Sequence, residues 1–220
     1  MNTLDNISPI DGRYARKTQD LRKYFSEMAL MRFRLQVEVE WFLFLCEELK
    51  LGGKTGFSSH QKQKLRSIYK TFNLLDAEKI KQIEKTTNHD VKAVEYFLKE
   101  KLQGSVYEPF SEFIHFCCTS EDINNLAYAL MSKSSLEDKI LPILKELINS
   151  LNVYALRYKA IAMLGRTHGQ PASPTTVGKE FINFVARLKR QIQFLEKFEF
   201  LGKINGAVGN FNAHLMVYPN

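Results

Sequence analysis

Cysteine is scarce in this chain of 220 residues, which contains only Cys46, Cys117 and Cys118. An odd number of cysteines, two of them adjacent, excludes a disulfide framework, and their spacing does not resemble a zinc site. We therefore expect three reduced, mostly buried thiols and no metal site.

Long apolar runs and familiar nucleotide-binding or hydrolytic motifs are also missing. No stretch approaches the roughly 20 consecutive apolar residues that span a bilayer. Residues 1–6 contain neither the basic region nor the apolar core of a signal peptide, so we expect a cytoplasmic protein that does not bind membranes. There is no Walker loop, no G-x-G-x-x-G behind a strand, no G-x-S-x-G elbow and no H-E-x-x-H.

A concentrated basic region is absent too. The chain has 31 Lys and Arg against 24 Asp and Glu, a net charge of +7, of which residues 1–110 contribute +4 and residues 111–220 contribute +3. Proteins that bind a nucleic-acid duplex usually have a basic stripe or tail. We therefore expect no nucleic-acid partner, whereas a modest positive charge suits a site for a small polyanion.

Helical periodicity is what the sequence has in abundance. Apolar residues recur at steps of three and four over residues 20–50, 136–158 and 176–200, and the last two stripes resemble the seam of an antiparallel helical bundle. Pro142 is expected in the first turn of its helix. No alternating strand pattern of useful length is present, so the fold class is mainly α. Shorter helices are expected at residues 59–71, 76–85, 90–102 and 122–131.

Four short polar segments interrupt these helices and contain the residues best suited to chemistry. The first, residues 8–14, is rich in turn-forming residues and ends on Arg13 and Tyr14. A guanidinium suits bidentate recognition of a phosphate or carboxylate. The alternative is an N-terminal turn in which Arg13 is only solvated.

The second and third segments each stand directly before an expected helix. Asn88, His89 and Asp90 precede one helix, and Thr119 and Ser120 open another. In one interpretation these side chains only cap their helices, with Asn88 or Asp90 as the cap of the first. In the other, the helix starts receive an anion, with His89 aimed at it and the hydroxyls holding a carboxylate.

The fourth segment, residues 164–174, is expected to be a glycine- and proline-rich loop around His168. A histidine held by such a loop, beside Thr167 and Gln170, differs from a histidine on the apolar face of a helix. Because imidazole titrates near neutrality, it can donate or accept a proton there.

Together, these segments resemble the adenylosuccinate lyase family, in its longer bacterial form. The T-x-H-G-Q-P pattern alone would indicate only the wider fumarase/aspartase superfamily. The motifs SPIDGRY (8–14) and TNHD (87–90) narrow the resemblance to this family. It runs from about residue 7 to the end of the chain. The motifs, in order, are SPIDGRY (8–14), TNHD (87–90), TSEDINN (119–125), GRTHGQP (165–171), GKE (178–180) and KINGAVGN (203–210).

The resemblance implies a fumarase/aspartase-like N-terminal helical domain over residues 1–118. Residues 119–220 would be the incomplete beginning of the central long-helix bundle domain. The superfamily's signature loop, which carries the serine base, would lie further along the chain. We therefore expect an N-terminal portion that is inactive alone, taken from an enzyme that assembles as a homotetramer.

The activity that the resemblance implies is a cofactor-free β-elimination of fumarate in purine biosynthesis. Its substrates would be adenylosuccinate, which gives AMP, and succinylaminoimidazole carboxamide ribotide. By resemblance His168 is the general acid, Arg13 and Tyr14 bind the phosphate end, and Thr119 and Ser120 hold the succinyl carboxylate. The lining of the site is assigned to Asn88, His89 and Asp90.

Two alternatives remain open. One is another fumarate-forming lyase of the same superfamily, of the argininosuccinate lyase type, which an assay with both substrates would separate. The other is a helical interaction module that has kept the fold and lost the activity. The intact set of motif residues argues against such decay.

Overall fold

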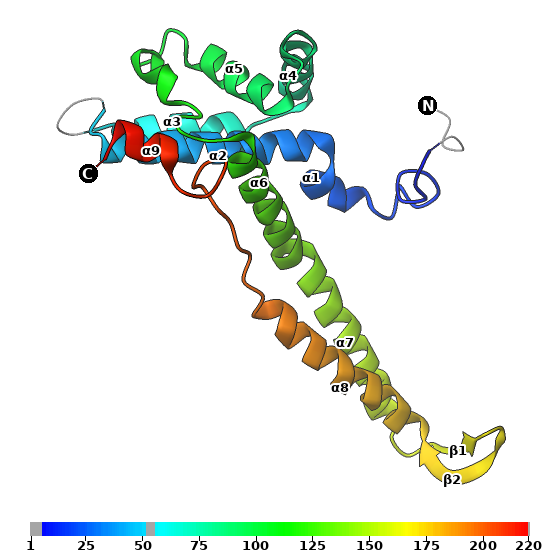
Figure 1. Cartoon of the computed structure of the whole chain (residues 1–220). Helices are drawn as coiled ribbons and strands as arrows, with labels where there is room; N and C mark the ends of the chain where they lie inside the picture. Colours follow the sequence, from blue (N-terminus) through cyan, green and yellow to red (C-terminus); the bar gives the residue numbers. More distant parts are fainter. Residues whose placement is uncertain (1–5, 52–55, 220) are drawn as a thin grey trace. The chain divides into compact units, whose positions relative to one another are not determined.

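The computed structural model describes residues 6–51 and 56–219, which form two compact units. The first unit comprises the chain up to Ser132 together with the segment from Leu201 onward, and the second comprises Lys133–Phe200. The domain boundary expected after residue 118 concerns the complete fold of the family and stays a prediction. The mainly helical character is confirmed, and Figure 1 shows the elements in chain order.

The first unit consists of helices. Those expected at 59–71 and 90–102 are confirmed almost to the residue. In chain order the elements are the 3₁₀ helix η2 (Gln19–Leu21), α1 (Arg22–Phe25), α2 (Glu27–Glu48), α3 (Ser59–Lys70), α4 (Leu74–Thr87), α5 (Asp90–Leu102), the 3₁₀ helix η3 (Glu108–Phe113), the beginning of α6 (Ser120–Ser135) and α9 (Asn212–Val217).

The expectation of one uninterrupted helix over residues 20–50 is wrong, because the chain breaks at Ser26. This residue is extended, with φ of −74° and ψ of 162°, and its hydroxyl accepts a hydrogen bond from the Ala29 N–H at 3.1 Å. A serine that accepts the free N–H of the third helical residue is a strong start signal. The break therefore separates the short α1 from the long α2.

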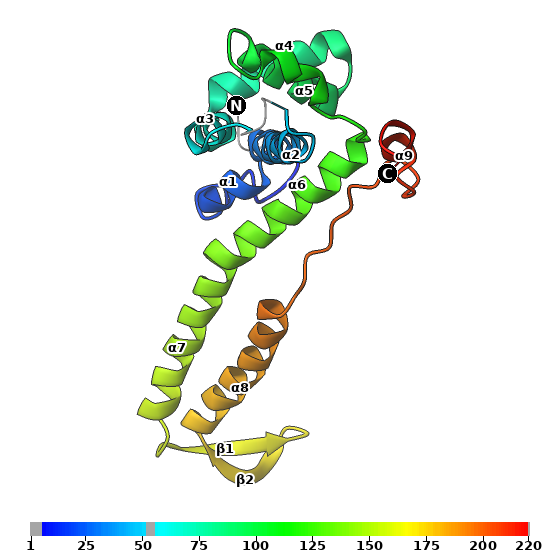
Figure 2. The same cartoon turned by 90° about the vertical axis from the view of Figure 1, so that its left-hand side faces the viewer.

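Helix α2 forms the centre of the first unit and is buried on more than one face. One cluster packs Leu35, Val39 and Phe42 against residues of α3, α4 and α5, and all three side chains are fully buried. A second cluster packs Phe33 and Val37 against α5 and the beginning of α6. Figure 2 shows α2 between these neighbours. The sequence predicted one buried stripe along this helix. The structure shows more burial than that, because apolar residues on several sides of α2 pack against neighbours.

The second unit is an antiparallel helix pair closed by a β-hairpin. The helices α7 and α8 pack through the buried Ile148, Val185 and Ile192. Of these, only Ile192 belongs to the stripes that predicted a bundle seam, whose Leu144, Leu151 and Leu188 are partly buried against this core. The elements are a π-helical turn (Leu136–Ile140), α7 (Leu141–Arg157), β1 (Ala162–Thr167), β2 (Gln170–Thr176) and α8 (Val177–Glu196).

Pro142 lies in the first turn of α7, as expected, but the helical backbone does not begin there. The residues of α6, the π-turn and α7 follow one another without a non-helical residue. A proline inside a helix removes a hydrogen bond and crowds the carbonyl four residues earlier. The wider π-turn, in which the Leu141 N–H donates to the Leu136 carbonyl, accommodates the proline.

The loop expected over residues 164–174 is instead a two-stranded antiparallel sheet, β1 paired with β2. The interruptions that suggested a loop are Gly165, Pro171 and Pro174, all of which lie in the strands. Both strands are edge strands, where proline is tolerated because no further strand needs its N–H. A glycine is needed at 165, since a Cβ there would lie 2.6 Å from the Ser173 carbonyl oxygen. Among the helices of residues 6–51 and 56–219, none combines the length and apolar character needed to cross a bilayer.

Candidate active site

The junction between α4 and α5 places His89 at the start of a helix. Asn88 ends α4 in the left-handed conformation, with φ of 50° and ψ of 33°, which asparagine tolerates better than most residues. His89 is then extended, and its Nδ1 accepts the Lys92 N–H at 3.0 Å. The cap expected from Asn88 or Asp90 is therefore wrong, since His89 itself is the N-cap of α5.

This capping hydrogen bond determines which nitrogen of His89 can donate. A ring nitrogen that accepts a hydrogen bond carries no proton, so the neutral imidazole has its proton on Nε2. That nitrogen lies 3.4 Å from the hydroxyl oxygen of Ser120. The side chain of His89 is about half exposed, with a relative exposure of 49%. His89 therefore presents an N–H donor to a position beside the start of α6.

The start of α6 is stabilised by Asp122, a residue that the sequence reasoning treated only as part of a cap. Its carboxylate accepts the Thr119 N–H at 2.9 Å, and its side chain is fully buried. This confirms capping at the start of α6 and leaves the Thr119 and Ser120 hydroxyls for other partners. Because the starts of α5 and α6 meet at His89 and Ser120, the unpaired N–H groups of two helices favour an anion there.

Asp122 also connects the start of α6 to the glycine-rich segment after Leu201. The ammonium of Lys203 lies 2.8 Å from its carboxylate, and the N–H groups of Asn205 and Gly206 donate to it at 3.2 and 3.1 Å. Burial acts to raise the pKa of Asp122, but the hydrogen bonds from Lys203 and the backbone lower it by more, so the pKa lies below its usual value. The conformation of Gly206, with φ of +83°, favours glycine at this point.

A buried arginine of α2, which sequence reasoning missed, contacts both helix starts. Arg34 pairs with the Asp90 carboxylate at 2.6 Å, and its Nε donates to Asn124 of α6 at 2.8 Å. Partial burial acts to raise the pKa of Asp90, but the guanidinium and backbone N–H groups lower it by more, so the pKa lies below its usual value. The sequence signal for Arg34 is weak, because Arg32 and Glu38 also lie among the apolar residues of this helix.

The N-terminal segment with Arg13 and Tyr14 is a series of turns. The Tyr14 N–H donates to the Pro9 carbonyl at 2.8 Å, and the Thr18 hydroxyl donates to the Ile10 carbonyl at 3.1 Å. The Arg13 guanidinium lies 5.8 Å from the centre of the Tyr14 ring. Next to this segment is a cavity of 550 Å³, lined by Ser8, Ile10, Asp11, Thr18, Leu21, Arg22, Phe25 and Ser26.

His168 occupies the tip of the β-hairpin in the second unit. His168 and Gly169 have φ of 48° and 76° and lie between the paired residues Thr167 and Gln170, which defines a two-residue turn of type I′. The imidazole is exposed on a backbone that the turn holds tightly. The structure thus brings His89 and Ser120 together in the first unit, while His168 belongs to the second.

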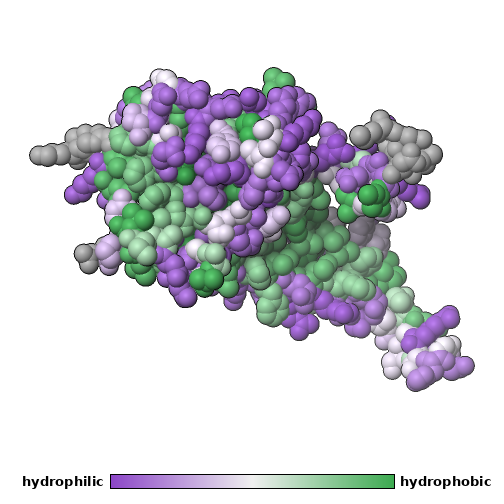
Figure 3. Space-filling view, turned by 45° about the horizontal axis from the view of Figure 1, so that its top comes forward, coloured by the Kyte–Doolittle hydropathy of each residue, from purple (hydrophilic) through white to green (hydrophobic). Residues whose placement is uncertain are grey.

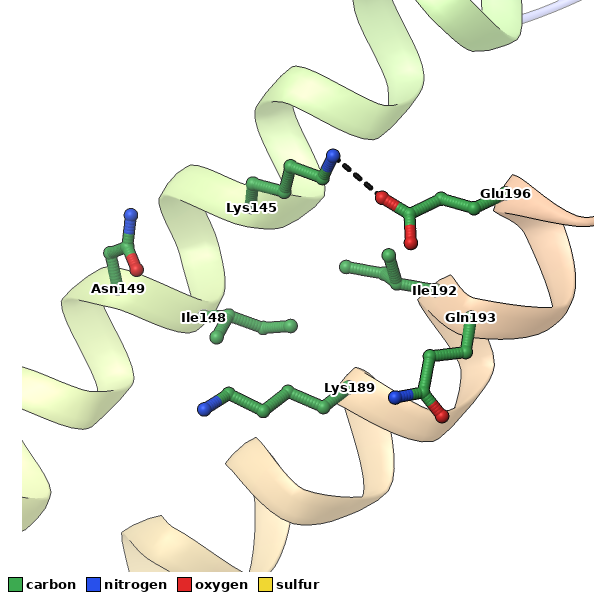
Figure 4. A pocket seen from close by; sticks show the side chains of 7 residues that line it. All are labelled: Lys145, Ile148, Asn149, Lys189, Ile192, Gln193 and Glu196. Carbon is green, nitrogen blue, oxygen red and sulfur yellow. Dashed lines mark ion pairs between the residues drawn. The ribbon is translucent and has the colours of Figure 1, made fainter.

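The second unit also has a hollow between α7 and α8, with a volume of 280 Å³. Figure 4 shows Lys145 reaching from α7 toward Glu196 of α8, and these two side chains form an ion pair of 2.6 Å. The hollow is lined by Lys145, Ile148, Asn149, Lys189, Ile192, Gln193 and Glu196. No histidine or cysteine is among these residues, so the hollow offers no group that exchanges protons near neutrality.

All three cysteines are free, as expected, and burial raises the pKa of Cys46 to about 12, which keeps this thiol protonated and unreactive at neutral pH. Within the described ranges, 6–51 and 56–219, no three side chains of His, Cys, Asp or Glu form a group that could hold a metal ion.

Comparison with known proteins decides the family of this chain. A family model described as a lyase matches residues 12–219, which is nearly the whole chain. The chain belongs to this lyase family. The match includes both helix starts and the hairpin tip, whereas residues 8–11 of the N-terminal segment lie outside it.

The curated lyase relatives are similar over the whole of this chain. Adenylosuccinate lyase of Haemophilus influenzae is 55% identical over 221 residues, and that of Escherichia coli K12 is 50% identical over 220 residues. Each comparison covers 100% of this chain and 48% of the relative. The chain therefore spans about half the length of the curated relatives it matches.

Solved structures of more distant proteins share the fold. A fumarate lyase from Mesorhizobium sp. BNC1 aligns with a TM-score of 0.70 at 18% identity, covering 89% of this chain and 44% of its own. A β-carboxy-cis,cis-muconate cycloisomerase from Acinetobacter calcoaceticus sp. ADP1 aligns with a TM-score of 0.68 at 20% identity, with coverages of 89% and 44%. The fumarase/aspartase-like fold expected from the sequence is confirmed.

Proposed function

We propose that this chain supplies part of the active site of an adenylosuccinate lyase of purine biosynthesis. The enzyme would eliminate fumarate from adenylosuccinate and from succinylaminoimidazole carboxamide ribotide. The observation that carries the proposal is the meeting of two helix starts, where His89 Nε2 lies 3.4 Å from the Ser120 hydroxyl. The identity of 55% to a protein of that name supports the choice of substrate class.

The helix starts suit the acidic half of the substrate. In the elimination a base removes a proton next to a carboxylate, and the resulting dianion needs fixed donors around it. The Thr119 and Ser120 hydroxyls, the first N–H groups of α6 and the Nε2–H of His89 are such donors. They would bind the succinyl carboxylate without a metal ion or cofactor. Asn88, which turns the chain before His89, would line the same site.

His168 would act as the general acid. An amine anion leaves poorly, so the departing nitrogen must be protonated as its bond to carbon breaks. An imidazole at the tip of a type I′ hairpin has few backbone conformations open to it, which suits a proton donor that must stay in place. General acid catalysis of this kind contributes typically about 10²–10⁴-fold to the rate.

The phosphate end of the nucleotide would be bound by Arg13 and Tyr14. A guanidinium can donate two parallel hydrogen bonds to phosphate oxygens, and a phenol can donate a third. The sequence suggested that Asp90 lines the site, but its pairing with Arg34 favours a role in holding the start of α5. A carboxylate would also repel a phosphate. We therefore assign phosphate recognition to the N-terminal segment.

Assembly as a homotetramer and a cytoplasmic location are further parts of this proposal. Figure 3 shows apolar residues at the molecular surface, and several lie on the long helices of the second unit. Apolar side chains that a monomer leaves exposed on bundle helices favour association with further helices. Examples with more than half of their surface exposed are Val153, Leu156, Phe184 and Phe194.

The proposal is tested by substrate choice. The protein expressed from its complete reading frame is assayed for fumarate release from adenylosuccinate and from argininosuccinate. We expect release from adenylosuccinate alone. Release from argininosuccinate alone would replace the proposal by the related lyase, and release from neither would favour a non-catalytic helical module.

A further inference from the structure

Arg34 is a buried cation in the middle of α2, and it makes polar contacts to two other helices. Its side chain is only 7% exposed. A buried guanidinium is unfavourable unless its donors are paired, so its partners are informative. They are the Asp90 carboxylate at 2.6 Å and the Asn124 amide oxygen at 2.8 Å.

These two partners lie next to the two helix starts of the site. Asp90 is the first residue of α5 and directly follows His89. Asn124 lies in α6, four residues after Ser120. A guanidinium is planar, and its N–H groups diverge at fixed angles. One rigid group therefore bonds to both helices and constrains how the two starts face each other, in addition to the apolar cluster that packs α5 and α6 against α2.

We propose that Arg34 is a positioning residue that holds His89 and Ser120 at their observed separation. This inference rests on the proposed function for its catalytic consequence, because Arg34 would act on the reaction only through its partners Asp90 and Asn124. It assigns Asp90 to the same device, as the group through which Arg34 holds α5. Lysine cannot replace arginine here, since a single ammonium lacks the fork that reaches Asp90 and Asn124 together.

Two variants test this inference, and a third is their control. Arg34→Lys keeps the charge but removes the guanidinium that bonds to both partners. Asn124→Ala removes only the contact to α6, and it keeps the inference testable if Arg34→Lys does not fold. Arg66→Lys is the matched control, because the Arg66 guanidinium also makes two hydrogen bonds of 2.8 Å to a carboxylate, that of Glu40 between α3 and α2.

The first measurement is spectroscopic and does not depend on activity. The ring nitrogens of His89 are observed by NMR in residues 1–220, with a His89→Gln variant to assign the signals. In the unaltered chain we expect the Nε2–H tautomer. Both test variants should shift the His89 signals, and Arg66→Lys should leave them in place.

The second measurement is the kinetics of the protein from the complete reading frame. A displacement of about 1 Å costs on the order of 100-fold in rate. We expect kcat to fall about 10- to 100-fold in both test variants, with a smaller change in KM, and to stay unchanged in Arg66→Lys.

Unchanged His89 signals in both test variants would overturn the inference, and so would wild-type kcat in folded variants whose signals shift. If the signals shift but the unaltered protein cleaves no adenylosuccinate, the positioning by Arg34 stands and the proposed function fails.

Discussion

The Asp122 carboxylate provides the sharpest test of how the candidate site is held together. It is fully buried and accepts hydrogen bonds from three backbone N–H groups, those of Thr119, Asn205 and Gly206, besides the Lys203 ammonium. Asp122→Asn keeps nearly the same shape. It removes the negative charge and replaces one acceptor oxygen by an amide NH₂ group, which is itself a donor and cannot accept from these N–H groups or from Lys203.

The size of the effect follows from these contacts. Removing one partner of a buried ion pair costs about 3–5 kcal/mol. The Lys203 side chain is 34% exposed, so water can solvate part of its freed charge, and we take the lower end of that range. We expect Asp122→Asn to lower the free energy of unfolding by about 3 kcal/mol.

The matched control is Glu121→Gln, the same change one residue earlier. Glu121 is exposed, so this variant loses only the interaction of a charge with a helix start, about 0.3–1 kcal/mol. Both variants are unfolded with urea and followed by the fluorescence of Trp41, the single tryptophan. This ring lies 6.1 Å from His214 of α9, so it also reports detachment of the segment after Leu201.

The dependence on pH has a definite sign. The pKa of Asp122 lies below its usual value in the folded chain, so its contribution is present above the unfolded pKa of about 3.9 and is lost as the pH falls through the folded pKa. The difference between the unaltered chain and Asp122→Asn should shrink in acid. Equal losses of stability in Asp122→Asn and Glu121→Gln would refute the reasoning.

Three further predictions concern other parts of the chain. Burial acts to lower the pKa of His115, but the hydrogen bond and charge of Glu38 at 2.6 Å raise it by more, while burial raises the pKa of Glu38 itself. The stabilising contribution of this pair should therefore be lost as the pH rises through the raised pKa of His115, be lost again in acid as Glu38 is protonated, and be absent in Glu38→Gln, as urea titrations across pH will measure. Gly178→Ala would place a Cβ 2.4 Å from the Ala155 carbonyl oxygen, so calorimetry should show α7 and α8 destabilised by about 1–3 kcal/mol, and an unchanged transition would contradict this close packing. Residues 1–220 alone should release no measurable fumarate from adenylosuccinate, since no recognisable serine signature loop is present in this sequence, and turnover by the purified chain would disprove this.

The fold was predictable wherever local signals agreed. The helix at 90–102 was found to the residue because its periodicity and its starting segment pointed to the same boundaries. The break at Ser26 was missed, since one capping serine does not outweigh an apolar pattern that continues across it. The β-hairpin was missed because Gly165, Pro171 and Pro174 are typical of loops. Prolines are tolerated here only because both strands are edge strands, whereas a central strand would not accommodate them.

The candidate site was predictable as a set of segments but not as an arrangement. Motif order pointed to His89 and Ser120, and the structure places them side by side. The contacts of Arg34 and Asp122 could not be read from the sequence, because they join residues about 90 and 80 positions apart, where spacing along the chain carries no information. The reassignment of Asp90 depends on such a contact.

The most direct test of the proposed function is the rate of fumarate release after loss of the His168 imidazole. The protein from the complete reading frame is assayed with adenylosuccinate as the unaltered enzyme, as His168→Ala and as His60→Ala, an exposed histidine of α3 that serves as the control. The account predicts a rate lower by about 10²–10⁴-fold in His168→Ala, with its unfolding transition preserved, and an unchanged rate in His60→Ala. An unaltered rate in His168→Ala would contradict it.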